Sequence, residues 1–98
     1  MASSDEKAPA LDFNALVLSL GSSAIVHLGE APDPTTGQKR DQPELTMAQQ
    51  SIDLLAMLQE KTRGNLTAEE ARFLENMLFD LRMLFVQVSR RQSPAKSP

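Results

Sequence analysis

The sequence predicts an all-α protein in which an N-terminal helix packs on a C-terminal antiparallel αα-hairpin. Three segments repeat apolar residues at intervals of three and four, the spacing that marks one face of an α-helix. No run of alternating apolar and polar residues, rich in Val, Ile and Thr, indicates a β-strand. The segment ends also carry residues that start and stop helices. A chain of 98 residues is long enough for one such domain.

The first helix is predicted over residues 13–28. Asp12 is suited to cap the free backbone N–H groups at its start, and Gly29 suits the left-handed position after its end. A core-facing stripe follows the helical spacing: Phe13, Leu16, Val17, Leu20, Ala24 and Leu28. Leu18, Ile25 and Val26 lie on the opposite side. This helix is therefore apolar nearly all round and needs burial on more than one side.

Three small residues, Gly21, Ser22 and Ser23, lie near the middle of this helix. The glycine lowers helix propensity by about 1 kcal/mol, and the absence of bulk lets another backbone approach closely. Two interpretations remain open at this point. The small residues mark either tight packing within one chain or the crossing point of helices from two chains.

The second helix is predicted over residues 43–63, after a linker at 29–42. The linker is rich in proline and charge and has no apolar periodicity, so we expect it to be flexible. Pro43 fits the first helical position, and Gly64 ends the helix. The apolar stripe comprises Leu45, Ala48, Ile52, Leu55 and Ala56, widened by Met47, Leu54 and Leu58.

The third helix is predicted over residues 68–91 and has the clearest start signal in the chain. Thr67 and Glu70 form a capping box, in which each side chain bonds the backbone N–H of the other residue. Because the connection from the second helix is so short, the two helices form an antiparallel hairpin. Its core stripe comprises Leu74, Leu78, Leu81, Phe85 and Val88, broadened by Phe73, Met77 and Leu84.

The third helix carries a second apolar stripe, formed by Phe79, Met83 and Val86. Either the first helix covers this stripe or another chain does. A third helix of about 36 Å outreaches a first helix of about 24 Å, so one short helix cannot cover both of its sides. We therefore expect a surface for self-association or for a partner protein, formed by this stripe together with Leu18 and Ile25.

Size favours self-association. A single core in an ordered part of roughly 65 residues rarely supplies more than about 3–5 kcal/mol. The chain contains no Cys and only one His, so neither disulfides nor a Cys/His zinc site can add stability. A homodimeric helical bundle is the commonest remaining solution.

The residues predict no catalytic, cofactor-binding or metal-binding site, and we expect a protein that is not an enzyme. His27 is the only side chain suited to proton chemistry near neutral pH, and we expect it to be structural. Ser19, Ser22 and Ser23 lack, in sequence spacing, the base and orienting carboxylate that a nucleophilic serine needs. The turn at residues 61–67 is explained by helix termination and capping, although its two cations beside a helix start also suit an anion.

Charge distribution argues against a nucleic-acid platform. The net charge is −3, and residues 13–88 carry ten acidic and six basic side chains. The basic residues at 89–98 leave one alternative, a nucleic-acid-associated accessory protein that acts through its C-terminal tail. We expect disordered tails at 1–11 and 92–98 around a single helical domain at 12–91.

No segment predicts export or membrane insertion. Residues 1–10 lack the basic start and apolar run of a secretory signal. The apolar run at 13–28 is shorter than the roughly 20 residues that a membrane span needs. We expect a cytoplasmic protein without membrane contact, whose partner is a second copy of itself or another protein.

Several motifs resemble one family. Across the second helix they are Ala48, Ile52, Asp53, Leu55 and Leu58. The turn and the third helix add Lys61-Thr62-x-Gly64-Asn65-Leu66-Thr67-x-Glu69-Glu70, Leu81-Arg82 and Phe85-Val86. Over roughly residues 13–88 the chain resembles the DUF1844 family, a domain of unknown function. The resemblance implies a bacterial, cytoplasmic protein, and it brings no activity, cofactor or functional residue.

Overall fold

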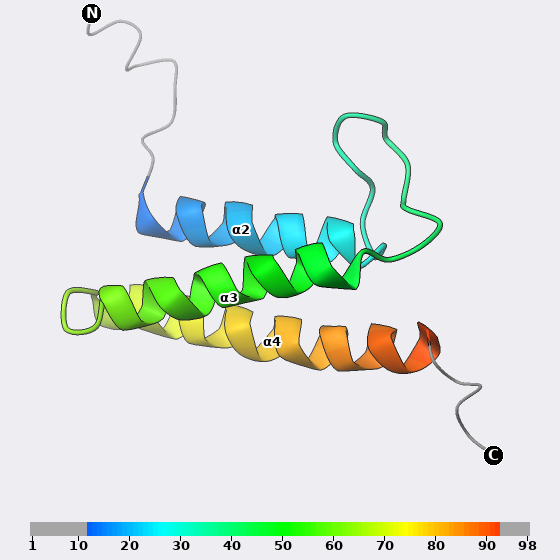
Figure 1. Ribbon diagram of the computed structural model, residues 1–98. Coiled ribbons are helices and arrows are strands. Elements are labelled where there is room, and N and C mark those ends of the chain that lie inside the picture. Colours follow the sequence, from blue (N-terminus) through cyan, green and yellow to red (C-terminus); the bar gives the residue numbers. More distant parts are fainter. Residues whose placement is uncertain (1–11, 93–98) are drawn as a thin grey trace, which may run out of the picture.

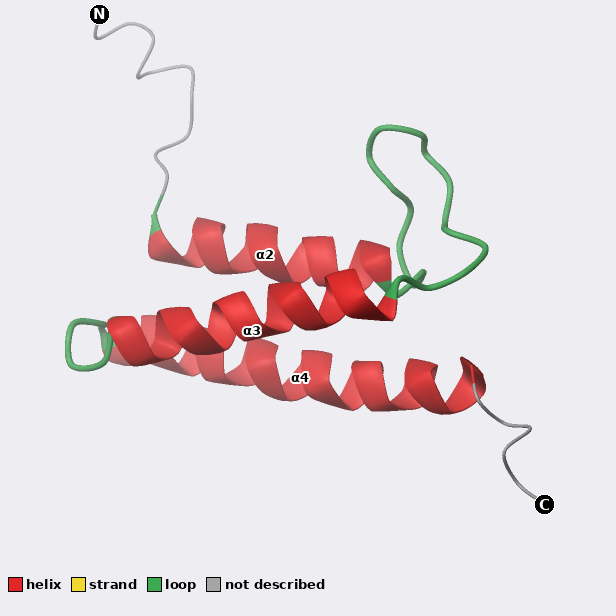
Figure 2. Ribbon diagram, viewed as in Figure 1, coloured by secondary structure: helices red, strands yellow, loops and turns green. Residues whose placement is uncertain are grey.

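The computed structural model describes residues 12–92 and confirms an all-α fold (Figure 1). The helices are α2 (Phe13–His27), α3 (Leu45–Lys61) and α4 (Ala68–Gln92), and each contacts both of the others. Within residues 12–92 no strand is present. A long loop joins α2 to α3 and a short turn joins α3 to α4 (Figure 2). The predicted tails lie outside the described residues, except that Gln92 belongs to α4.

The predicted capping residues at both ends of α2 are confirmed, although the helix ends at His27, one residue before the predicted end. The Asp12 carboxylate accepts a hydrogen bond from the Ala15 N–H at 2.8 Å. Gly29 has a φ of 80°, and its N–H donates to the Val26 carbonyl. The next N–H, from Glu30, donates to the Ile25 carbonyl, which completes a Schellman motif.

The start of α3 differs from the prediction, since the helix begins at Leu45 and not at Pro43. Glu44 has a ψ of 86°, outside the helical region. Its N–H donates to the carbonyl of His27 at 2.7 Å, and this bond joins the two ends of the α2–α3 loop. Because the Glu44 N–H is held in this tertiary hydrogen bond, α3 begins two residues after Pro43, the first helical position that the sequence predicts.

The hairpin turn between α3 and α4 forms largely as expected. Helix α3 ends at Lys61, two residues earlier than predicted, and Gly64 has a φ of 85°. The capping box at the start of α4 is present in both directions. The Thr67 N–H donates to the Glu70 carboxylate at 2.9 Å, and the Glu70 N–H donates to the Thr67 hydroxyl at 3.1 Å.

The core runs between the three helices in two clusters. The larger comprises Val17, Ala24, Ile52, Leu55, Leu74, Leu78 and Leu81. The smaller lies at the loop end and comprises Leu28, Ala48 and Val88. Ser51 is buried among these residues on α3. Gly21 is buried against Met77 of α4, so the close approach at the small residues occurs within one chain.

Three residues that the periodicity assigned to the core are exposed: Leu16, Met47 and Leu54. Met47 and Leu54 each precede a fully buried residue, Ala48 or Leu55. A step of one residue turns about 100° around a helix. Because only two neighbouring helices cover α3, its buried stripe is narrower than its apolar one.

Candidate interaction surface

The second apolar stripe of α4 faces solvent. Phe79, Met83 and Val86 are 64%, 50% and 45% exposed. On the same helix Leu78 and Leu81 are buried in the core, which shows that α4 packs with its other face. The interpretation in which the first helix covers this stripe is therefore wrong.

The stripe lines a shallow groove between α4 and α3, with a volume of about 450 Å³. Gln59 contributes from α3, and Leu78 forms part of the groove where the two helices meet. Glu75 and Arg82 add one charge of each sign. The groove is thus an apolar strip with polar residues along its rim, a composition typical of protein–protein interfaces.

The two α2 residues of the predicted surface lie elsewhere. Leu18 is 52% exposed but does not line the α3–α4 groove. Ile25 is half-buried and packs against the larger core cluster. Of the five predicted surface residues, the structure brings together the three on α4.

A second exposed apolar area lies on α3, and the sequence did not single it out. Leu54 and Met57 line a small hollow with Gln50 and Asp53. Periodicity placed Leu54 in the core. Ser51 is a small polar residue within the buried stripe of α3. Its position was the one signal in the sequence that this stripe is centred away from Leu54.

His27 belongs to a polar group at the base of the α2–α3 loop. Its Nδ1 lies 3.8 Å from the Glu44 carboxylate, which also lies 3.4 Å from the Arg40 guanidinium. Glu44 is the residue whose N–H bonds the His27 carbonyl. The contacts of His27 therefore help to hold the loop ends together.

The loop brings Ser19, Ser22 and Ser23 into one pocket with His27 and Asp33, a grouping that sequence spacing did not predict. No hydrogen bond joins a serine hydroxyl to the imidazole among the described residues. The Asp33 carboxylate instead accepts two hydrogen bonds from Thr35, one from the Thr35 hydroxyl at 2.6 Å and one from the Thr35 N–H at 2.8 Å.

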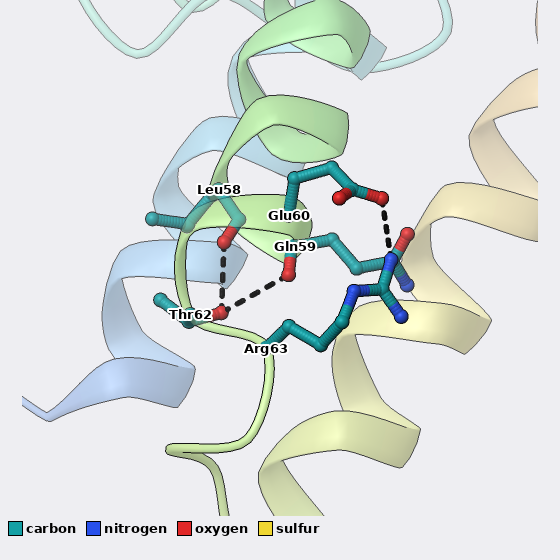
Figure 3. A network of polar contacts seen from close by, with 5 residues as sticks. All are labelled: Leu58, Gln59, Glu60, Thr62 and Arg63. Carbon is teal, nitrogen blue, oxygen red and sulfur yellow. Dashed lines mark hydrogen bonds and ion pairs between the residues drawn. The ribbon is translucent and has the colours of Figure 1, made fainter.

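At the α3–α4 turn, helix termination accounts for the polar side chains (Figure 3). The Thr62 hydroxyl donates to the Leu58 carbonyl at 2.7 Å, and Arg63 forms an ion pair with Glu60. Arg63, one of the two cations of the predicted anion site, is thus already paired with an acid of α3.

Of the basic C-terminal segment at 89–98, the structure describes residues 89–92, which end α4 and include Arg90 and Arg91. Arg91 pairs with Glu30 at 3.0 Å, so one of these charges is used within the chain. Among residues 12–92 no group of three His, Cys, Asp or Glu side chains is placed to hold a metal ion. No helix in the same part of the chain is long and apolar enough to cross a membrane.

Comparison with known proteins places these helices in one recognised unit. A model of the family described as a domain of unknown function (DUF1844) matches residues 10–87 of the 98-residue chain. The match covers α2 and α3 and most of α4. Neither the curated proteins nor the solved structures give a match.

Proposed function

The chain belongs to the DUF1844 family, whose description assigns no activity, and we propose that it is a non-catalytic protein–protein interaction module. Its binding element is the exposed stripe of α4. The observation that carries this proposal is the exposure of Phe79, Met83 and Val86 on a helix already packed by its opposite face.

Physical chemistry supports an interaction at this stripe. Removal of apolar surface from water contributes roughly 25 cal/mol per Å² to association, against which stands the entropy cost of joining two molecules. Residues at positions i, i+4 and i+7 form one continuous edge, which is the pattern by which a helix engages a protein groove or another helix. The rim charges of Glu75 and Arg82 add orientation to an otherwise apolar contact.

The non-catalytic part of the proposal rests on how the polar side chains are used. The imidazole of His27 faces Glu44, and the carboxylate of Asp33 is bonded to Thr35. Both contacts organise the α2–α3 loop. We further propose that the module acts in the cytoplasm.

A photo-reactive side chain at Val86 tests the proposal in cells that express the protein naturally. We expect a discrete cross-linked product that disappears when Met83→Asp is added. The matched control is the same side chain at Gln50, which faces outward on α3. A Val86 pattern no different from the Gln50 pattern would contradict an interaction at this stripe.

A second test changes the stripe itself. Phe79→Asp combined with Met83→Asp is expected to abolish association while the far-ultraviolet circular dichroism of the helices is retained. Leu54→Asp with Met57→Asp is the matched control, because these side chains are similarly exposed on α3. If both association and thermal stability survive the α4 double substitution, the interface lies elsewhere.

A further inference from the structure

Two opposite charges are arranged nearly symmetrically about Phe79. Glu75 precedes it by four residues and Arg82 follows it by three, and both line the groove that contains the stripe. With a rise of 1.5 Å per residue, they lie about 6 Å and about 4.5 Å from Phe79 along the helix axis. The most exposed apolar side chain of the stripe thus lies between an acid and a base on one rim.

These two charges have no ion-pair partner within residues 12–92, where the ion pairs use other side chains. The acids that are paired there are Glu30, Glu44 and Glu60. Glu75 and Arg82 are seven residues apart on the same side of the helix, too distant to pair with each other. They remain available to a partner.

We propose that the partner is a second copy of this chain, with the two α4 helices antiparallel about a two-fold axis at Phe79. This inference rests on the proposed function and names its partner. The axis places Phe79 against the partner's Phe79. It also places Glu75 beside the partner's Arg82, with an axial offset of about 1.5 Å. The symmetry repeats this ion pair on the other side of the axis, between Arg82 and the partner's Glu75.

The charge of the whole helix favours the antiparallel direction. Residues 68–80 contain four acids and one arginine, a net charge of −3, whereas residues 81–92 contain three arginines and no acid. Antiparallel helices set each acidic half against a basic half, and parallel helices set like charges together. The helix dipoles also favour this arrangement, because they point in opposite directions when the two helices are antiparallel.

The contact is small, because the axis sets only Phe79 against its own counterpart, whereas Val86 lies opposite the partner's Arg72. Interfaces of this kind lie at the low end of the size range of specific complexes. We therefore expect a reversible dimer with a dissociation constant on the order of micromolar, detectable by sedimentation over a concentration series.

Charge reversal tests the pairing. Glu75→Arg alone and Arg82→Glu alone each create two like-charge pairs in the dimer, and each is expected to weaken dimerisation at least about tenfold. An equal mixture of the two variants restores both pairs and is expected to dimerise as the unmodified protein does. Asp53→Arg is the control, since it reverses an exposed acid on the outer side of α3 and is expected to leave the dissociation constant of the dimer unchanged.

Cross-linking tests the direction, because the chain contains no cysteine of its own. Arg72 and Val86 lie seven residues before and after Phe79, so the axis places each opposite the other on the partner. Mixed Arg72→Cys and Val86→Cys proteins are expected to form a disulfide under mild oxidation. The Val86→Cys protein by itself is not expected to form a disulfide, because the two copies of position 86 are separated by about 21 Å along the helices.

Three results would overturn the inference: a monomer up to several hundred micromolar, single charge variants that dimerise unchanged, or efficient cross-linking of Val86→Cys to itself. The proposed function fails on a different observation. If the in-cell product from Val86 has the mass of one copy plus another protein, the second-copy inference is wrong and the interaction module stands.

Discussion

Gly21 of α2 lies directly against the side chain of Met77 of α4. A Cβ atom at position 21 would be 2.5 Å from the Met77 sulfur and 2.9 Å from its terminal methyl carbon. Gly21 is helical, without the positive φ of Gly29 or Gly64. The glycine is therefore required by the close approach of two helices, and not by its backbone conformation.

Gly21→Ala is expected to destabilise the protein by about 1 kcal/mol. Overpacking costs about 1–3 kcal/mol, and the higher helix propensity of alanine offsets up to about 1 kcal/mol. The loss stays moderate because the nearest atoms are the end of a flexible side chain. Urea unfolding of Gly21→Ala, with Ser22→Ala on the exposed side as control, measures the effect. In a Met77→Ala background the same substitution should become stabilising, and a loss that persists there would contradict the contact.

Thr67→Ala is expected to cost about 1 kcal/mol of stability, because it removes the hydroxyl that accepts the Glu70 N–H at the start of α4. The free energy of unfolding in urea checks this value. Thr46→Ala changes the same residue type in the first turn of α3, where the side chain is exposed, and should shift stability by less than about 0.5 kcal/mol. Equal effects of the two substitutions would show that the capping box does not stabilise the hairpin.

Leu54 and Leu55 are neighbours with opposite environments, since Leu54 is 45% exposed and Leu55 is fully buried. Leu55→Ala is expected to lower the free energy of unfolding by about 2–5 kcal/mol, through lost burial and the cavity left behind. Leu54→Ala is expected to cost less than about 1 kcal/mol. Thermal and urea unfolding of both variants measure the difference. A reversed order would mean that α3 is rotated about its axis, with Leu54 and not Leu55 turned toward the core.

The α2–α3 loop is expected to depend on pH through Asp33. Hydrogen bonds from the Thr35 hydroxyl and the Thr35 N–H hold the pKa of Asp33 below its ordinary value. A lowered pKa in the folded state stabilises the loop turn above the unfolded pKa, and this contribution is lost as the pH falls through the folded pKa. An NMR titration of the Asp33 carboxyl carbon should show the low pKa, and Thr35→Val should raise it. A Thr35→Val titration that matches the unmodified protein would contradict this cause.

Local signals predicted the hairpin because its determinants lie close together in the chain. Thr67 and Glu70 bond each other across three residues, and Gly64 lies three residues after the end of α3. The same holds for Asp12 and Gly29 at the ends of α2. Each of these interactions forms within one turn of helix, so it can be recognised without knowledge of the other helices.

The candidate surface was predictable only in part. The spacing of Phe79, Met83 and Val86 marked a second face on α4, and that face is exposed. Ile25 shares an apolar helix with Leu18, yet it packs on the core while Leu18 faces solvent. Periodicity orders residues around one helix, but it does not state how far a neighbouring helix reaches around it.

Local sequence patterns were enough to predict the three helices, the caps of α2 and of the start of α4, the hairpin and the family to which the chain belongs, because helix formation depends on spacing and on neighbours within four residues. The packing of the three helices against one another decides which apolar faces are covered. It left Leu16, Met47 and Leu54 exposed, and it brought His27 and Asp33 into one pocket. These outcomes depend on contacts between residues far apart in the chain, where the relative rotation of packed helices selects the side chains that water can reach.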